Sequence, residues 1–461
     1  MTPRTEPPEA WTPAHQLARR LVEPVERFLQ IQTASGVVLA VAATAALVWA
    51  NSPWGESYEA FFDARLTVEL GPLRTSETLR FWIDEGLMVL FFFVVGLEVR
   101  REIHEGELST PRRASLPLAA AVGGMIAPAS VYIAFNYGSP AIAGWGVPMA
   151  TDIAFALAVL TLLGRRVPPA LRVLLLALAI VDDIGATLAI ALFYSSGVAL
   201  EGVLLAAAGV LAVVVMQRMG VRSAIAYVPA GALLWLGMHH AGVHPTLAGV
   251  VLGLMTPVRT WLGEDDAVRI TREALRDYRS GAKNDDEDAV GRSLERIAWV
   301  PREAVSPLAR LERGLHGWVA FGVMPLFALA NGGIPLFEWQ GEVDWAVALG
   351  TGLGLVVGKP LGIVGASWVT ARLGLTALPR GVSWAGLTVV GLLGGVGFTM
   401  AMFITNLAHP SSTAAMTKVA IFVGSTCAAG LALIVGRALL PPEPEAGAAS
   451  SAAEAERSTA V

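Results

Sequence analysis

Charged residues are scarce in this chain: they make up 15% of its 461 residues, against about 25% in an ordinary soluble domain. The single cysteine, Cys427, excludes a disulfide within the chain. Ser-His-Asp, Cys/His metal-site and phosphate-loop patterns are missing, so we expect neither an enzyme nor a cofactor, and no nucleic-acid partner. Lysine is nearly absent too, leaving three copies among 33 basic residues. The whole chain is 54% hydrophobic and has a mean hydropathy of +0.58.

Long uncharged stretches alternate with short charged segments, which indicates an all-α polytopic membrane protein. Windows of roughly 18 to 25 apolar residues predict about twelve transmembrane helices. The expected spans are 31–50, 80–97, 114–135, 142–164, 170–195, 198–216, 222–240, 243–259, 315–334, 345–371, 384–407 and 415–437.

Three segments lie outside the two blocks of spans, 31–259 and 315–437. Residues 1–30 form an N-terminal segment, in which 15–30 is compatible with an amphipathic surface helix. Residues 260–314 form a charged loop, expected to hold a short helix and to be partly disordered. The tail, 438–461, has the composition of a disordered segment.

Basic residues indicate the orientation of the spans, because they gather on the cytoplasmic side of membrane proteins. Segments on one side hold 27 of the 33 lysines and arginines, and those on the other hold four. Both termini are therefore expected in the cytoplasm. On the outer side, residues 63–76 alternate around Gly71-Pro72, which fits a small β-hairpin or an irregular loop.

Four ionisable residues lie near the middle of predicted spans: Asp152, Asp182, Asp183 and Lys359. Each costs roughly 2.5–3.5 kcal/mol at the centre of a bilayer, so such residues are functional candidates. Three acids against one base leave charge that an ion or proton must balance. Buried salt bridges that only hold helices together are the alternative, but such pairs stabilise weakly. A desolvated lysine, unlike arginine, can also release a proton.

Helix breakers accompany these charges. Pro148 precedes Thr151-Asp152 in the fourth span, and Gly394-Gly395 lie near the middle of the eleventh. Broken helices at the midplane expose helix ends to ions in many transporters, and Asp152 suits positive N-terminal ends as Lys359 suits negative C-terminal ends. The two spans hold corresponding places in triplets three to five and ten to twelve, which suggests inverted repeats. Close packing at glycine remains the alternative.

Ordered motifs from about residue 30 to 437 resemble the bacterial sodium/proton antiporters of the NhaA type. They include FFFVVGLEVRREI (91–103), AFNY (134–137), MATDIAFALAVLTLLGRRVP (149–168), LALAIVDDIGATLAIALFY (176–194), GVHPTLAGVVLG (242–253), PLFALANGGI (325–334), GKPLGI (358–363) and GGVGFTMAMFI (394–404). The resemblance implies twelve helices with two broken ones crossing at the midplane. It also implies electrogenic exchange in the bacterial inner membrane, and a homodimer through the outer hairpin.

The resemblance also assigns residues. It implies that Asp182 and Asp183 bind Na⁺ or Li⁺ and protons, and that Lys359 pairs with Asp182. Thr151 and Asp152 match the pair at the broken fourth helix. Four residues match positions linked to the family's pH response: Glu98, Glu102, His244 and Glu312.

Other interpretations remain for these outer residues and for the activity. Glu98 and Glu102 also fit plain interfacial charges, and His244 fits a hydrogen-bonding histidine. Pro245 and the length of the 260–313 loop depart from the family pattern. For the whole chain, a sodium-coupled symporter of an organic anion or a passive channel are the alternatives to pH and sodium homeostasis by exchange.

Overall fold

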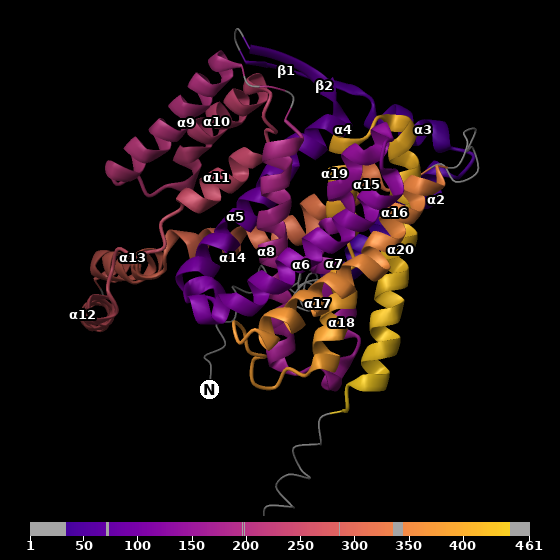
Figure 1. Cartoon of the computed structure of the whole chain (residues 1–461). Coiled ribbons are helices and arrows are strands. Elements are labelled where there is room, and N and C mark those ends of the chain that lie inside the picture. The colour runs from indigo at the N-terminus through magenta and orange to yellow at the C-terminus, as the bar shows by residue number, and fades with distance from the viewer. Residues whose placement is uncertain are drawn as a thin grey trace, which may run out of the picture. The chain divides into compact units, whose positions relative to one another are not determined.

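In the computed structural model, each of the twelve predicted spans corresponds to a helical segment (Figure 1). The structure describes residues 34–442 except 71–72, 196, 198, 285 and 335–343. The N-terminal helix expected at 15–30, and most of the tail expected at 438–461, lie outside the described residues.

Within the described residues, six helices are long and apolar enough to cross a membrane, and three bent helix pairs raise the number to nine. The other three predicted spans contain helices too short to be counted alone: α5 (Met88–His104), α10 (Val228–Ala241) and α11 (Leu247–Met255). Twelve spans thus account for the apolar helices of an all-α membrane fold.

The chain divides into two compact units. One comprises Met1–Ala64, Ser115–Asp182 and Met324–Val461, and the other comprises Arg65–Ala114 and Asp183–Val323. The division falls between Asp182 and Asp183, inside the continuous helix α8 (Pro169–Phe193), so the chain crosses from one unit to the other within a single helix.

The first unit holds the helices on which most of the deep charges lie. The short helix α16 packs against the long helix α20, and α18 packs against both α17 and α20. Its elements are α2 (Ala34–Ala50), α3 (Gly55–Phe62), α6 (Pro111–Asn136), η4 (Pro140–Met149), α7 (Ile153–Thr161), η5 (Gly164–Arg166), the first half of α8, α15 (Met324–Asn331), α16 (Trp345–Leu353), η8 (Gly354–Gly358), α17 (Lys359–Arg372), α18 (Trp384–Gly394), α19 (Phe398–Ala408) and α20 (Ser411–Leu439).

Two helices of this unit, α6 and α17, approach closely because glycines lie at their contact. A Cβ atom on Gly123 of α6 would lie 2.2 Å from the backbone oxygen of Gly362 of α17, and one on Gly362 would lie 2.0 Å from that of Gly123. Small residues let membrane helices bring their backbones together. The contact holds the helix that begins at Lys359 against α6.

In the second unit, α9 packs against α10 and α11 packs against α5 (Figure 1). Gly242 ends α10 with a φ of +78°, a left-handed conformation that favours glycine. The elements are β1 (Arg65–Leu70), β2 (Leu73–Thr78), α4 (Leu79–Phe81), η2 (Trp82–Leu87), α5, η3 (Glu107–Ser109), the second half of α8, α9 (Leu200–Arg218), η6 (Ala224–Tyr227), α10, α11, α12 (Glu264–Lys283), α13 (Glu287–Ala304), α14 (Pro307–Trp318) and η7 (Val319–Val323).

The β-hairpin expected at 63–76 is present as the antiparallel pair β1 and β2. Its register pairs Arg65 with Thr78 and Leu70 with Leu73, and residues 71–72 between the two strands lie outside the described residues. The alternation of apolar and polar residues therefore predicted the strands within about two residues at each end.

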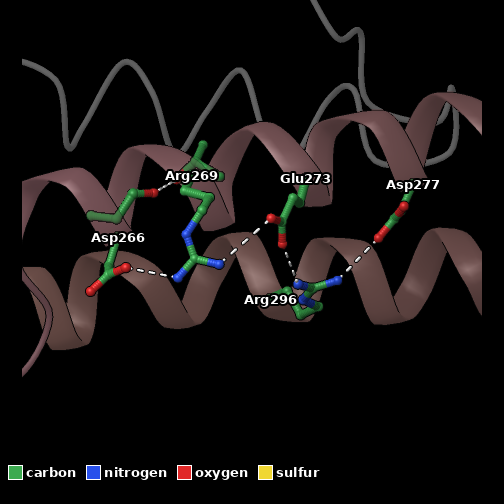
Figure 2. Close-up of polar contacts among 7 residues, drawn as sticks. Asp266, Arg269, Glu273, Asp277 and Arg296 are labelled. Carbon is green, nitrogen blue, oxygen red and sulfur yellow. Dashed lines mark hydrogen bonds and ion pairs between the residues drawn. The ribbon is translucent and has the colours of Figure 1, made fainter.

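The loop expected at 260–314 with one short helix is more regular than predicted. It contains a hairpin of two long helices, α12 and α13, followed by the start of α14. Figure 2 shows ion pairs within and between these polar helices: Arg269 contacts Asp266 of its own helix at 2.7 Å, and Arg296 of α13 contacts Asp277 of α12 at 3.0 Å. Each helix also buries small residues against the other, such as Ala274 and Ser293. The prediction of one short helix for this segment was wrong, because it holds two long helices that pack against each other.

Candidate functional site

Two spans of the first unit are interrupted at their middle. η4 and α7 make an angle of 44° across a break at 150–152, and α18 and α19 make an angle of 44° across 395–397. The backbone of Ala150 is extended, and Pro148 lies inside η4, a 3₁₀ helix. The two breaks meet, since the backbone N–H of Asp152 donates to the carbonyl of Val396 at 2.7 Å.

Asp152 links the N-termini of the two helices that follow these breaks. Its Oδ1 accepts from the backbone N–H of Phe155 in α7 at 3.0 Å. Its Oδ2 accepts from the backbone N–H of Thr399 in α19 at 3.2 Å and from the hydroxyl of Thr399 at 2.5 Å. A carboxylate at a helix N-terminus satisfies unpaired N–H groups and faces the positive end of the helix dipole. This is the placement that the sequence predicted.

Lys359 and Thr151 contact the C-terminal ends of the preceding half-helices. The ammonium of Lys359 donates to the carbonyl of Met149, the last residue of η4. The hydroxyl of Thr151 lies 2.9 Å from the carbonyl of Gly394, the last residue of α18. Positive and negative helix ends at the two breaks are thus each faced by a group of the opposite polarity.

Asp182, in the middle of α8, receives contacts from both spans. Its Oδ2 accepts from the hydroxyl of Thr151 at 2.6 Å and from Lys359 Nζ at 2.5 Å. Asp182 and Lys359 are both 0% exposed. The other carboxylate oxygen, Oδ1, is buried and has no hydrogen-bond partner within the described residues. A buried carboxylate oxygen left in this way is suited to ligating a hard cation.

Asp183 follows Asp182 in the same helix and is also buried, with 5% of its surface exposed. Adjacent positions on an α-helix point about 100° apart, so the two carboxylates face different directions from one level of α8. The structure therefore brings together Thr151, Asp182 and Lys359, and it joins Asp152 to the same breaks through Val396 and Thr399.

Thr399 is a residue of this cluster that the sequence reasoning missed. It is 0% exposed and donates to Asp152 through both its backbone and its hydroxyl. A signal was present: it lies two residues after Gly397, where the second half of a broken span begins. Hydroxyl residues are favoured near such helix starts.

The four residues predicted for the pH response fall into two groups within the second unit. Glu312 of α14 forms an ion pair with Arg101 of α5, and Glu102 lies 3.8 Å from the same arginine. Arg101, Glu102 and Glu312 all act electrostatically on Glu98. His244 lies apart from them, between α10 and α11, with its Nδ1 3.3 Å from Glu85 Oε2.

Comparison with known proteins gives a family. The model of the family described as Na+/H+ antiporter 1 matches residues 26–435. A protein of Myxococcus xanthus named Na(+)/H(+) antiporter NhaA 2 is 51% identical, over 99% of this chain and 97% of the relative. One of the same name from Sorangium cellulosum is 50% identical over 99% and 98%. The Na(+)/H(+) antiporter NhaA of Janthinobacterium sp. is 48% identical over 95% and 97%.

These matches cover nearly all the helices described above, and the motifs that carry the deep charges lie within the matched range. Together with its apolar helices they identify a multi-pass membrane protein, and this chain belongs to the Na+/H+ antiporter 1 family.

Proposed function

We propose that this protein is an electrogenic antiporter that extrudes Na⁺ or Li⁺ in exchange for protons. The observation that supports this most directly is the buried Asp182–Lys359 pair at the meeting point of two broken spans, with an unsatisfied oxygen on Asp182 and a second buried carboxylate next to it. Curated relatives at 48–51% identity carry the same activity in their names.

The exchange follows from competition for Asp182 and Asp183. When both are ionised, their oxygens are hard ligands for a small cation. A cation beside Asp182 repels the ammonium of Lys359, so cation binding favours loss of a proton from the lysine. Return of protons neutralises the site and releases the cation.

Thr151 and Asp152 support the site without carrying the ion. Thr151 orients Asp182 through its hydroxyl, and Asp152 offsets the positive ends of α7 and α19. We expect the halves of the broken spans to move when access alternates between the two sides.

The matched test replaces carboxylate by amide at two places. Asp183→Asn should abolish Na⁺-driven dequenching of a pH dye in everted vesicles, because a neutral amide neither binds the cation with the same strength nor takes up the proton. Glu201→Gln, an exposed acid at the start of α9, is the control and should exchange as the wild type does. Wild-type rates in Asp183→Asn would refute the assignment. A symporter would take up a labelled organic anion with sodium, and a channel would conduct without coupling.

The site, the topology and the assembly are part of the same proposal. The uneven distribution of basic residues between the two sides supports an orientation with both termini in the cytoplasm. The family supports a location in the bacterial inner membrane. Within the described residues β1 and β2 form a two-stranded sheet, and a sheet edge of this kind supports a homodimer that adds the partner's strands there. A membrane-impermeant thiol reagent should reach a cysteine placed at either terminus only in everted vesicles. Deleting residues 65–78 should convert the dimer to a monomer in light scattering.

We also propose that Glu98, Glu102, Glu312 and His244 tune the response to pH. Arg101 holds the acidic group together, and Glu85 holds His244. Glu312→Gln would leave Arg101 with one acidic partner fewer and should shift the pH at which exchange begins. An unchanged pH profile would mean that the acidic residues are plain interfacial charges.

A further inference from the structure

A buried hydrogen-bond pair lies at the outer ends of the two broken spans. The hydroxyl of Tyr132, in α6, donates to the carbonyl of Ala141 in η4 at 2.8 Å, and it lies 3.1 Å from Nε2 of His409. His409 is the residue directly after α19. Since a phenol has one hydrogen, and Ala141 accepts it, Nε2 of His409 must supply the hydrogen of the second bond.

The pair is enclosed by its surroundings. Tyr132 is 0% exposed and His409 is 8% exposed. η4 passes so close that a Cβ atom on Gly144 would lie 2.1 Å from Nε2 of His409 and 2.6 Å from the Tyr132 hydroxyl. Glycine is required there because any side chain would displace the pair.

These contacts join two half-helices that are already joined at their other ends. η4 ends and α19 begins at the breaks, where Asp152 contacts Thr399. At the far ends, Tyr132 connects Ala141 at the start of η4 with His409 at the end of α19. In the proposed orientation, η4 and α19 are the outer halves of their spans, so the second connection lies on the outer side.

We propose that Tyr132 and His409 are positioning residues that hold the outer halves of the two broken spans together, and that their release opens the ion site to the outside. This inference rests on the proposed antiport. The connected arrangement closes the outer side, and the ion exchanges with the outer solution only after η4 and α19 separate.

Protonation of His409 is the natural trigger for release. Burial lowers the pKa of this histidine, and the carboxylate of Asp344 partly opposes the shift. Asp344 caps the N-terminus of α16, η4 carries no titratable side chain, and α6 contributes Tyr132. A protonated His409 has a second N–H to satisfy, which the buried arrangement disfavours. Acid on the outer side therefore favours separation, the state in which protons load.

The direction of this pKa shift sets how the stability of the connected state depends on the outer pH, and over which pH range. A state with His409 in water has an ordinary histidine pKa near 6.5, and the connected state has a lower one. Above pH 6.5 the ratio of the two states does not change with pH. The fraction of protein in the connected state decreases as the outer pH falls below that value.

The test measures the apparent KM for Na⁺ separately at each face, in everted and right-side-out vesicles. Tyr132→Phe removes both bonds of the hydroxyl. We expect KM to rise at the cytoplasmic face and fall at the outer face, each by up to about fivefold, the equivalent of one hydrogen bond. Ser130→Ala is the matched control, because within the described residues the Ser130 hydroxyl bonds only the carbonyl of Ile126 in its own helix. It should leave both values unchanged.

A second variant separates titration from hydrogen bonding. His409→Gln keeps an N–H donor without a titratable group, so it should retain the wild-type KM at both faces and lose their dependence on outer pH below 6.5. If Tyr132→Phe does not insert, His409→Leu removes the donor and leaves the bond from Tyr132 to Ala141, and it gives the same comparison of faces.

KM values at both faces that match those of the wild type in Tyr132→Phe and His409→Leu, accompanied only by lower melting temperatures, would overturn the inference in favour of a purely structural pair. An unchanged outer-pH dependence in His409→Gln would overturn the trigger. Failure of the proposed antiport is a different result, because the wild-type protein itself would then show no Na⁺-driven proton movement.

Discussion

Lys359 Nζ lies 2.5 Å from Asp182 Oδ2, and both side chains are fully buried. The two residues are 177 positions apart, on α17 and α8. A pair of this kind contributes little net stability but becomes costly when one partner is removed. In the proposed mechanism it therefore couples the state of the ion site to the packing of α8 and α17.

The first prediction concerns this coupling. Lys359→Met should lower the free energy of unfolding by about 3–5 kcal/mol, because Asp182 then remains buried without its positive partner. The double variant Lys359→Met/Asp182→Asn should recover most of that loss while remaining inactive in exchange. Thermal melting in detergent measures both. A double variant as unstable as the single one would contradict the explanation.

A second prediction concerns Asp152, which caps two helices at once. Asp152→Ala should cost more than the ~0.5–2 kcal/mol typical of a single cap, because the N-termini of α7 and α19 both lose their acceptor. Ser383→Ala is the control: Ser383 caps only α18, by accepting from the N–H of Gly386 at 3.1 Å. Equal melting temperatures in the two variants would count against the double cap.

Close packing of α6 on α17 gives a third prediction. Gly362→Ala should destabilise the protein by about 1–3 kcal/mol, since the new methyl group meets the backbone of Gly123 and no rotamer avoids it. Gly365→Ala lies one turn away on α17 with nothing within 4 Å of the added Cβ atom. It should match or exceed the stability of the wild type. Melting curves of the two variants decide the point.

The charged hairpin supplies a fourth prediction. Arg296→Ala removes the contacts with Glu273 and Asp277, which are solvent-exposed. Each such pair is worth about 0.2–1 kcal/mol and is screened by salt. Amide hydrogen exchange along α12 and α13 should therefore accelerate modestly at low salt and return to wild-type values at high salt. Na⁺/H⁺ exchange should stay unchanged, and its loss would assign the hairpin a role in transport.

The fifth prediction concerns stability against pH. Because burial lowers the pKa of His409, the folded protein binds this proton less tightly than the unfolded chain does. The contribution of neutral His409 is complete above its ordinary pKa near 6.5, and it is lost as pH falls below that value. Melting of the wild type should decline over this range more steeply than melting of His409→Gln. Parallel curves would mean that His409 does not contribute.

Much of the fold was predictable because it follows from local rules. Apolar windows predicted the helices, the alternation of apolar and polar residues predicted the two strands, and Pro148 with Gly394-Gly395 predicted the two breaks. The segment at 260–314 was predicted poorly, since α12 and α13 pack against each other, and a contact between two polar helices is not visible within the sequence of either one.

The residues of the candidate site likewise fall into some that the sequence indicated and others that it did not. The sequence indicated Asp182 and Lys359 because charge in an apolar span is conspicuous. It gave no comparable signal for Tyr132 and His409, which are ordinary residues at the ends of spans. Only their hydrogen bond in the folded structure makes them candidates.

The sequence by itself determined that this chain crosses a membrane repeatedly, where its helices break and which charged residues lie deep, because the cost of charge and of unpaired backbone in lipid acts on each segment separately. The tertiary structure decided which helix ends Asp152 and Lys359 face, that Thr399 donates to Asp152 and that His409 lies within hydrogen-bond distance of Tyr132. These depend on contacts between segments tens to hundreds of residues apart, and no periodicity within one segment specifies them.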